Sequence, residues 1–115
     1  MPIPETEHKR VSNMLSKYCE SRIPGHIRHK LRMGYAIDRT WVHLYEERPS
    51  FHDKSQWSRM VIAKFKYTIK KNNWTLYWAD RNSKWHIYEG IKNPTRHFEG
   101  LLEEVNDDPT GIFYG

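Results

Sequence analysis

The sequence predicts a single α+β domain: an N-terminal helix, a five-stranded antiparallel meander sheet, a C-terminal helix and a short apolar tail. Three strand-like runs separated by two short polar turns occupy residues 60–89, and an amphipathic stripe lies near each end of the chain. The turns are too short for a parallel crossover, which needs a dozen or more residues. Consecutive strands are therefore expected to pair as antiparallel neighbours.

The composition indicates one domain with a modest but aromatic core. The chain has 115 residues, of which 37% are hydrophobic, with five Trp, seven Tyr and four Phe. Aromatic side chains bury large areas, so a small core of this kind is adequate. The single cysteine, Cys19, excludes an internal disulfide and fits a reducing compartment.

The chain is expected to be cytoplasmic, without a membrane partner. A membrane-spanning helix requires an apolar run of about 18 residues, and the sequence has no run of this length. Its N-terminal residues also lack the apolar core of a signal peptide.

A first helix is predicted over residues 4–21. Pro4 suits the first turn, and Pro24 requires the helix to end before it. An apolar stripe with helical spacing consists of Val11, Met14, Leu15, Tyr18 and Cys19. Because Cys19 lies on this stripe, it is interpreted as a small buried hydrophobic residue rather than a reactive thiol.

The five strands are predicted at about residues 31–37, 41–47, 60–70, 74–80 and 85–89. In the third strand, Val61, Ala63, Phe65, Tyr67 and Ile69 alternate with polar and basic residues, which is typical of a half-buried strand. A polar loop is expected over residues 50–58. In the last hairpin, the same alternation predicts that Trp74, Trp78 and Trp85 share one face of the sheet.

A second helix is predicted over residues 94–106, with Asn93 as its N-cap and Pro94 at its first position. Its apolar stripe consists of Phe98, Leu101, Leu102 and Val105. Asp108 and Pro109 are expected to end the helix. The apolar tail over residues 112–114 is expected to dock on the sheet or on a second subunit.

Several segments together resemble a small bacterial family catalogued as domain-of-unknown-function family 3024. They are Arg48-Pro49, IAKFKY at 62–67, WTLYWADRN at 74–82, KWHIY at 84–88 and the ending DDPTGIFYG at 107–115. The resemblance covers most of the chain after Gly34 and the N-terminal helix only loosely. It implies a short stand-alone bacterial protein with no assigned activity, and it carries over no catalytic or ligand-binding residues.

The charge is positive and unevenly distributed. The formal net charge is +5, and the isoelectric point is about 9.4. Residues 59–71 contain five Lys or Arg and no acid, whereas residues 99–108 contain five acids and no base. This pattern favours an anionic partner. The alternative is that the acidic helix neutralises the basic strand within the molecule.

The residue types of this chain allow one metal-binding and two nuclease interpretations, and none of the three has a specific motif. His26 and His29 have metal-ligand spacing, but neighbouring cations and the lack of further ligands argue against a metal. A metal-dependent nuclease would draw on Asp38, Glu46 or Glu47, and Lys64. A metal-free ribonuclease would draw on Lys64, Lys66, Tyr67, Arg81, His86 and Tyr88. We assign no catalytic residue, no metal ligand and no cofactor, and we lean against an enzyme.

The leading functional prediction is a binding module for RNA or single-stranded DNA. Lysines would pair with phosphates while bases stack on aromatic rings. The candidate residues are Lys64, Lys66, Lys70, Tyr77, Arg81, His86 and Tyr88. This prediction requires Lys64, Lys66 and Tyr88 to share one surface. Two alternatives stay open, namely an ordinary solvated face over an aromatic core, and a protein-interaction or homodimeric accessory module.

Overall fold

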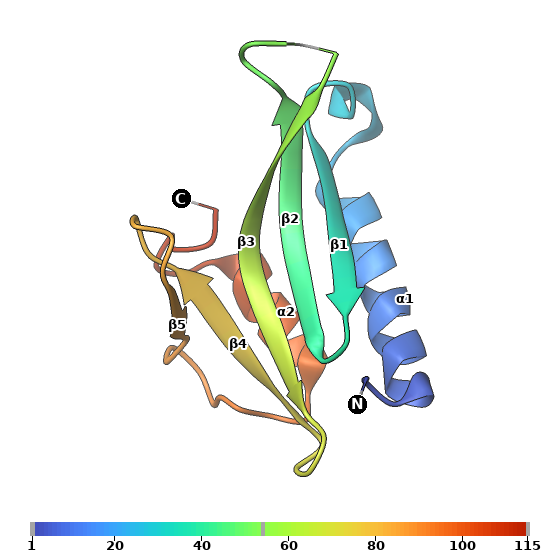
Figure 1. Ribbon diagram of the computed structural model, residues 1–115, viewed down its shortest axis with the longest axis vertical. Helices are drawn as coiled ribbons and strands as arrows, with labels where there is room; N and C mark the ends of the chain where they lie inside the picture. The colour runs from blue at the N-terminus through green and yellow to red at the C-terminus, as the bar shows by residue number, and fades with distance from the viewer. Residues whose placement is uncertain (1, 54, 115) are drawn as a thin grey trace.

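The computed structural model describes residues 2–53 and 55–114 and confirms the α+β fold (Figure 1). Helix α1 spans Glu5–Arg22 and is followed by a short 3-10 helix, η1, at Gly25–Ile27. The strands are β1 (Arg32–Asp38), β2 (Trp41–Pro49), β3 (Trp57–Thr68), β4 (Asn73–Ala79) and β5 (Trp85–Ile87), and helix α2 spans Phe98–Asp107. The sheet order is β1-β2-β3-β4-β5, and every neighbouring pair is antiparallel.

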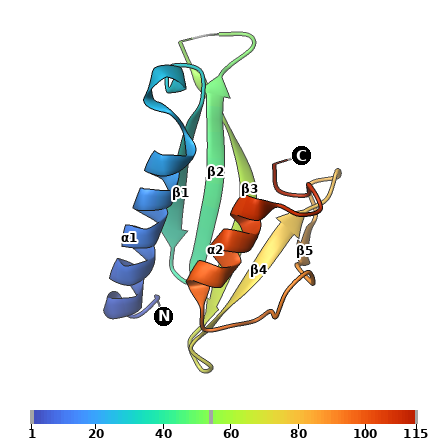
Figure 2. The same cartoon turned by 180° about the vertical axis from the view of Figure 1, so that it is seen from behind.

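Both helices lie on the same face of the sheet, as Figure 2 shows from the helix side. Helix α1 runs alongside β1, and α2 crosses in front of β2 and β3 in Figure 2. No other helix or strand of the described residues covers the opposite face. This opposite face is called the open face below.

The core fills the space between the sheet and the two helices. Trp74 is at its centre: it is fully buried, and its ring centroid lies 4.9 Å from that of Phe98 and 5.0 Å from that of Tyr67. The other fully buried large side chains are Phe65, Phe98, Leu15, Leu44, Leu76, Leu101, Val11, Val42 and Val105. These residues are the apolar members of the alternating strands and of the two helical stripes, so the amphipathic patterns correctly predicted the core.

Cys19 lies on the α1 stripe, where it is half-buried rather than fully buried. Burial raises the pKa of its thiol to about 11, so the group stays protonated and unreactive near neutral pH.

The predicted start of the second helix was wrong. Asn93 does not cap a helix: its side-chain oxygen accepts a hydrogen bond from Leu76 N, and its Nδ2 donates to Leu76 O and Tyr88 O. Thr95 then exchanges two backbone hydrogen bonds with Trp74. The segment therefore pairs with β4 beyond the short strand β5, and α2 begins only at Phe98.

The predicted shared face of three tryptophans was also wrong. Trp78 pairs with His86 and Ala79 pairs with Trp85, so Trp85 lies on the opposite face from Trp74 and Trp78. The cause is the turn, where the Asp80 carboxylate accepts hydrogen bonds from the backbone N–H groups of Asn82 and Lys84. This arrangement sets the register of the hairpin one residue away from the expected one.

A β-bulge interrupts the alternation of β3. The register shifts between Leu44 and Tyr45 of β2, so Ile62 and Ala63 are both buried. Val61 then pairs with Tyr45 on the open face instead of continuing the apolar row that was predicted from Val61 to Ile69. Strand β3 also begins at Trp57, so the preceding loop is shorter than the predicted 50–58.

The apolar tail docks on its own chain. Phe113 packs on Tyr88 with ring centroids 5.3 Å apart, and the hydroxyl of Tyr114 bonds to that of Tyr18 in α1. The Asp108 carboxylate accepts the backbone N–H groups of Phe113 and Tyr114. The tail therefore belongs to the helix side of the molecule and adds nothing to the open face.

Glu7 joins both helices to the sheet, which makes stability dependent on pH. Its carboxylate accepts the Arg10 guanidinium and the Trp74 indole N–H, each at 2.8 Å, while Arg10 also reaches Glu99 of α2. The hydrogen bond from Arg10 is the main reason why the pKa of Glu7 lies below its usual 4.5. The ionised form is thus the one that the fold favours.

We predict that Glu7→Gln lowers the free energy of unfolding at pH 7 by roughly 1 kcal/mol. A depressed pKa contributes stability above the unfolded value, and this contribution is lost as pH falls through the folded value. Urea unfolding between neutral pH and pH 3 should therefore show a shallower acid-side fall for Glu7→Gln than for the wild type. Glu5→Gln is the matched control, because the exposed Glu5 lies in the same helical turn. Equal profiles for the two variants would contradict the prediction.

Candidate nucleic-acid interface

Aromatic and basic side chains gather on the open face, opposite the helices. Strand pairing sets His43 beside Lys64 and Lys64 beside Tyr77, and it sets Trp41 beside Lys66. Trp85 reaches the same face because it pairs with Ala79, two residues along β4 from Tyr77. The open-face patch is defined as Trp41, His43, Lys64, Lys66, Tyr77 and Trp85. All six side chains are partly exposed.

The lysine ammonium groups of the patch lie over its rings. Lys64 Nζ is 4.5 Å from the ring centroid of Trp85 and 5.9 Å from that of Trp41. Lys66 Nζ is 4.9 Å from the Trp41 centroid and donates a hydrogen bond to Thr40 Oγ1. The rings of Trp41 and Tyr77 are tilted against each other at 5.3 Å. Positive charge and aromatic surface are therefore in direct contact, within the range of cation–π attraction.

The acidic stretch at residues 99–108 lies on the other side of the sheet. Glu99 pairs with Arg10 of α1, and Glu104 accepts the hydroxyl of Tyr88. Asp108 holds the tail. These acids engage the helix side, so the lysines of the patch are not neutralised by them.

His43 is sensitive to the charge of the patch. Burial lowers the pKa of its imidazole, and the neighbouring Lys64 ammonium lowers it further. Asp38, at the end of β1, acts weakly in the opposite direction. His43 is therefore neutral near pH 7, and Lys64 and Lys66 supply the positive charge of the patch.

The structure brings together three of the seven residues predicted from the sequence: Lys64, Lys66 and Tyr77. Lys70 lies beyond the last strand residue of β3, and Arg81 lies in the turn between β4 and β5. These two residues border the sheet and are not part of the patch.

The other two predicted residues, His86 and Tyr88, were wrongly placed. Tyr88 is buried on the helix side, where it donates to Glu104 and where burial raises its pKa to about 12. His86 pairs with Trp78 and therefore points to the helix side, where its ring packs against the Trp78 ring. Its Nε2 lies 2.8 Å from Oδ2 of Asp80. The requirement that Lys64, Lys66 and Tyr88 share one surface therefore fails, and the surface that does form has a different composition.

Three members of the patch were missed, although two of them left a signal. Trp41 and His43 alternate with the apolar Val42 and Leu44, so the pattern already placed them away from the core. Their position beside the lysine-rich strand followed from the predicted order of strands. Trp85 could not have been found in this way, because its face depends on the register of the last turn.

The catalytic interpretations gain no support from the geometry. Asp38 and Glu47 lie too far apart to share a metal ion. Glu47 pairs with Arg32, which is six residues, or roughly 20 Å, from Asp38 along β1. Glu46 points to the other face and pairs with Arg48. Among the described residues, no group of three or more His, Cys, Asp or Glu side chains is arranged to hold a metal ion.

The ribonuclease set is divided between the two faces. Lys64 and Lys66 lie on the open face, whereas Tyr67 and Tyr88 are buried on the helix side. Together with the position of His86, this leaves no shared site for the six residues.

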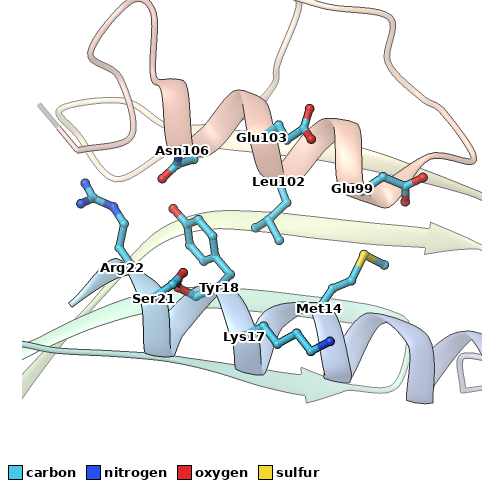
Figure 3. Close-up of a pocket in the computed structure, with 9 residues that line it drawn as sticks. All are labelled: Met14, Lys17, Tyr18, Ser21, Arg22, Glu99, Leu102, Glu103 and Asn106. Atoms are coloured by element: carbon cyan, nitrogen blue, oxygen red, sulfur yellow. Dashed lines mark hydrogen bonds between the residues drawn. The ribbon is translucent and has the colours of Figure 1, made fainter. Parts of the chain in front are cut away.

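A groove of about 690 Å³ separates the two helices on the helix side (Figure 3). Met14, Tyr18 and Leu102 point into it. Its charged rim combines Lys17 and Arg22 of α1 with Glu99 and Glu103 of α2. Because the rim carries both signs of charge, the groove lacks the single positive sign of the open-face patch.

The family model for a domain of unknown function, DUF3024, matches residues 3–115. The chain belongs to this family. The match confirms the resemblance seen in the sequence and extends it through the N-terminal helix. No curated protein and no solved structure matches the DUF3024 chain. Among the helices of its described residues, none has the length and apolar character needed to cross a membrane.

We predict that Lys64→Met raises the pKa of His43 in this DUF3024 protein. The substitution removes the neighbouring positive charge, which is one of the two causes of the low value. The pKa is measured by NMR titration of the imidazole protons. Lys70→Met serves as the control, because Lys70 lies outside the patch. An unchanged His43 pKa in Lys64→Met would show that the two side chains are not close in solution.

Proposed function

We propose that this protein binds single-stranded nucleic acid, RNA or DNA, on the open-face patch. The observation that supports the proposal is the contact between ammonium groups and exposed rings, with Lys64 over Trp85 and Lys66 over Trp41. Phosphates would pair with the lysines, and bases would stack on the rings at about 1–3 kcal/mol per base. A cytoplasmic location is part of this proposal, in keeping with the free thiol of Cys19.

The proposed binding mode is an exchange of partners on the patch. In the free protein each lysine is held by a ring, at a gain of about 0.5–1 kcal/mol for an exposed cation–π contact. When a strand binds, a base takes the place of the ammonium group on the ring. The flexible lysine then turns to the adjacent phosphate. The exchange is favourable because a stacked base contributes more than the contact it replaces.

We predict that Lys64→Ala/Lys66→Ala weakens binding to oligothymidylate or oligouridylate by at least about tenfold near 0.1 M salt. Each phosphate contact on a single strand contributes about 0.7 to the slope of log affinity against log salt, so the slope should fall by about 1.4. Quenching of tryptophan fluorescence follows binding directly, because Trp41 and Trp85 are on the patch.

The control variant is Lys9→Ala/Lys17→Ala, which removes the same charge from exposed positions on α1. It should keep the wild-type affinity and nearly the wild-type slope. If the wild type binds neither oligonucleotide at low salt, or if both double variants weaken binding equally, the proposal is wrong.

A second candidate function is assembly through the same face, either with a second copy or with a protein partner. Ile87 supports it, because this large apolar side chain is 52% exposed and pairs with Tyr77 of the patch. We propose a salt-insensitive dimer in this case. Light scattering on the wild type and on Ile87→Glu separates the two functions: a dimer that Ile87→Glu dissociates, together with no oligonucleotide binding, would favour assembly.

A further inference from the structure

A second group of cation–aromatic pairs lies farther along the open face, beyond the β-bulge. The guanidinium carbon of Arg59 is 3.8 Å from the ring centroid of Tyr45, and that of Arg32 is 3.6 Å from the ring centroid of Trp57. Strand pairing places all four on this face, because Arg32 and Arg59 both pair with Glu47, two residues along β2 from Tyr45, and Trp57 is two residues from Arg59. These four residues are called the guanidinium arm.

Gly34 makes room for the Tyr45 ring of the arm. A Cβ atom at this position would lie 2.8 Å from the hydroxyl oxygen of Tyr45 and 2.9 Å from its ring carbons. The Tyr45 ring therefore lies against the backbone of β1, which only glycine allows at this distance. The ring is held between that backbone and the Arg59 guanidinium.

The stacked guanidinium groups remain accessible. The Arg59 side chain is 51% exposed, and Arg32 is also exposed. A guanidinium that lies flat on a ring keeps its second face free for a base and its N–H edge free for a phosphate. The aromatic residue underneath also restricts the arginine, which lowers the entropic cost of binding.

We infer that the guanidinium arm is a second subsite for the same single strand that the open-face patch binds. The inference rests on the proposed function. Strand β2 runs from Trp41 in the patch to Pro49, which pairs with Trp57 of the arm. These eight steps between neighbouring residues correspond to roughly 26 Å. At about 3.4 Å per stacked nucleotide, this distance corresponds to roughly eight nucleotides, within the range that single-strand binding domains cover.

Glu47 lowers the affinity of the guanidinium arm for phosphate. Its carboxylate lies 3.5 Å from the Arg59 guanidinium and directly between the two arginines in the strand order. A carboxylate at this position competes with phosphate for Arg59. Removal of its charge therefore strengthens the hold of the arm on a strand.

The test compares oligothymidylates of about three and about nine nucleotides on the intact protein. If only the patch binds, the longer strand gains about sevenfold from its greater number of binding registers. With both subsites, we expect a gain of at least about 30-fold, since further bases then stack on the arm. Arg32→Gln/Arg59→Gln removes the two guanidinium groups, and it should reduce the gain to about sevenfold while the short strand keeps its affinity. Lys9→Ala/Lys17→Ala, which removes the same charge from α1, should keep the full gain.

Glu47→Gln provides an independent readout, because it should tighten binding of the longer strand about threefold and leave the shorter strand unaffected. The inference is overturned if the wild type shows only the register gain, or if Arg32→Gln/Arg59→Gln keeps the full gain. In these cases binding of the short strand still supports the patch. If neither strand binds to the wild type, the proposed function and the inference both fail.

Discussion

The packing of both helices on one face of the sheet is the constraint on which the rest of this structure depends. A strand directs successive side chains to opposite faces, so each strand sends one set into the core and the other to the open face. Trp74 fixes this choice for β4 because its ring is enclosed by Tyr67 and Phe98 while its N–H is held by Glu7 of α1. The alternating residues that point to the open face are therefore left without a covering layer of secondary structure.

The open face meets this requirement by placing cations over its rings. An uncovered aromatic surface invites association with other chains, and charged residues on strands are a common protection against it. Here Lys64, Lys66, Arg32 and Arg59 each lie over a tryptophan or tyrosine ring. The cations that shield the rings also place a positive charge beside each exposed aromatic side chain. The cations that protect the sheet are thus also the side chains that the proposed function would use to bind a nucleic-acid strand.

Periodicity predicted the strands and the core, but not the details that depend on single turns. The alternation around Phe65 and the stripe of α2 were sufficient to place the buried residues. The face of Trp85 depends on the five-residue turn, in which the Asp80 carboxylate accepts hydrogen bonds from the backbone N–H groups of Asn82 and Lys84. The face of Val61 depends on one extra residue in the β-bulge of β3. Tyr88 follows a short strand that ends at Ile87, and its burial depends on the long-range contacts with Glu104 and Phe113. Local patterns do not contain this information.

The two faces of the sheet also differ in charge, and this difference affects how a partner would approach. Three of the five acids of residues 99–108 make contacts on the helix side, where Glu99 binds Arg10, Glu104 binds Tyr88 and Asp108 binds the tail. Lys64 and Lys66 of β3 lie on the opposite side of the sheet. Their positive charge can attract a polyanion to that side before any contact forms. The acidic helix, which first suggested internal neutralisation, is kept away from the lysines. Under the proposed function, this separation would favour approach of an anionic strand to the open face.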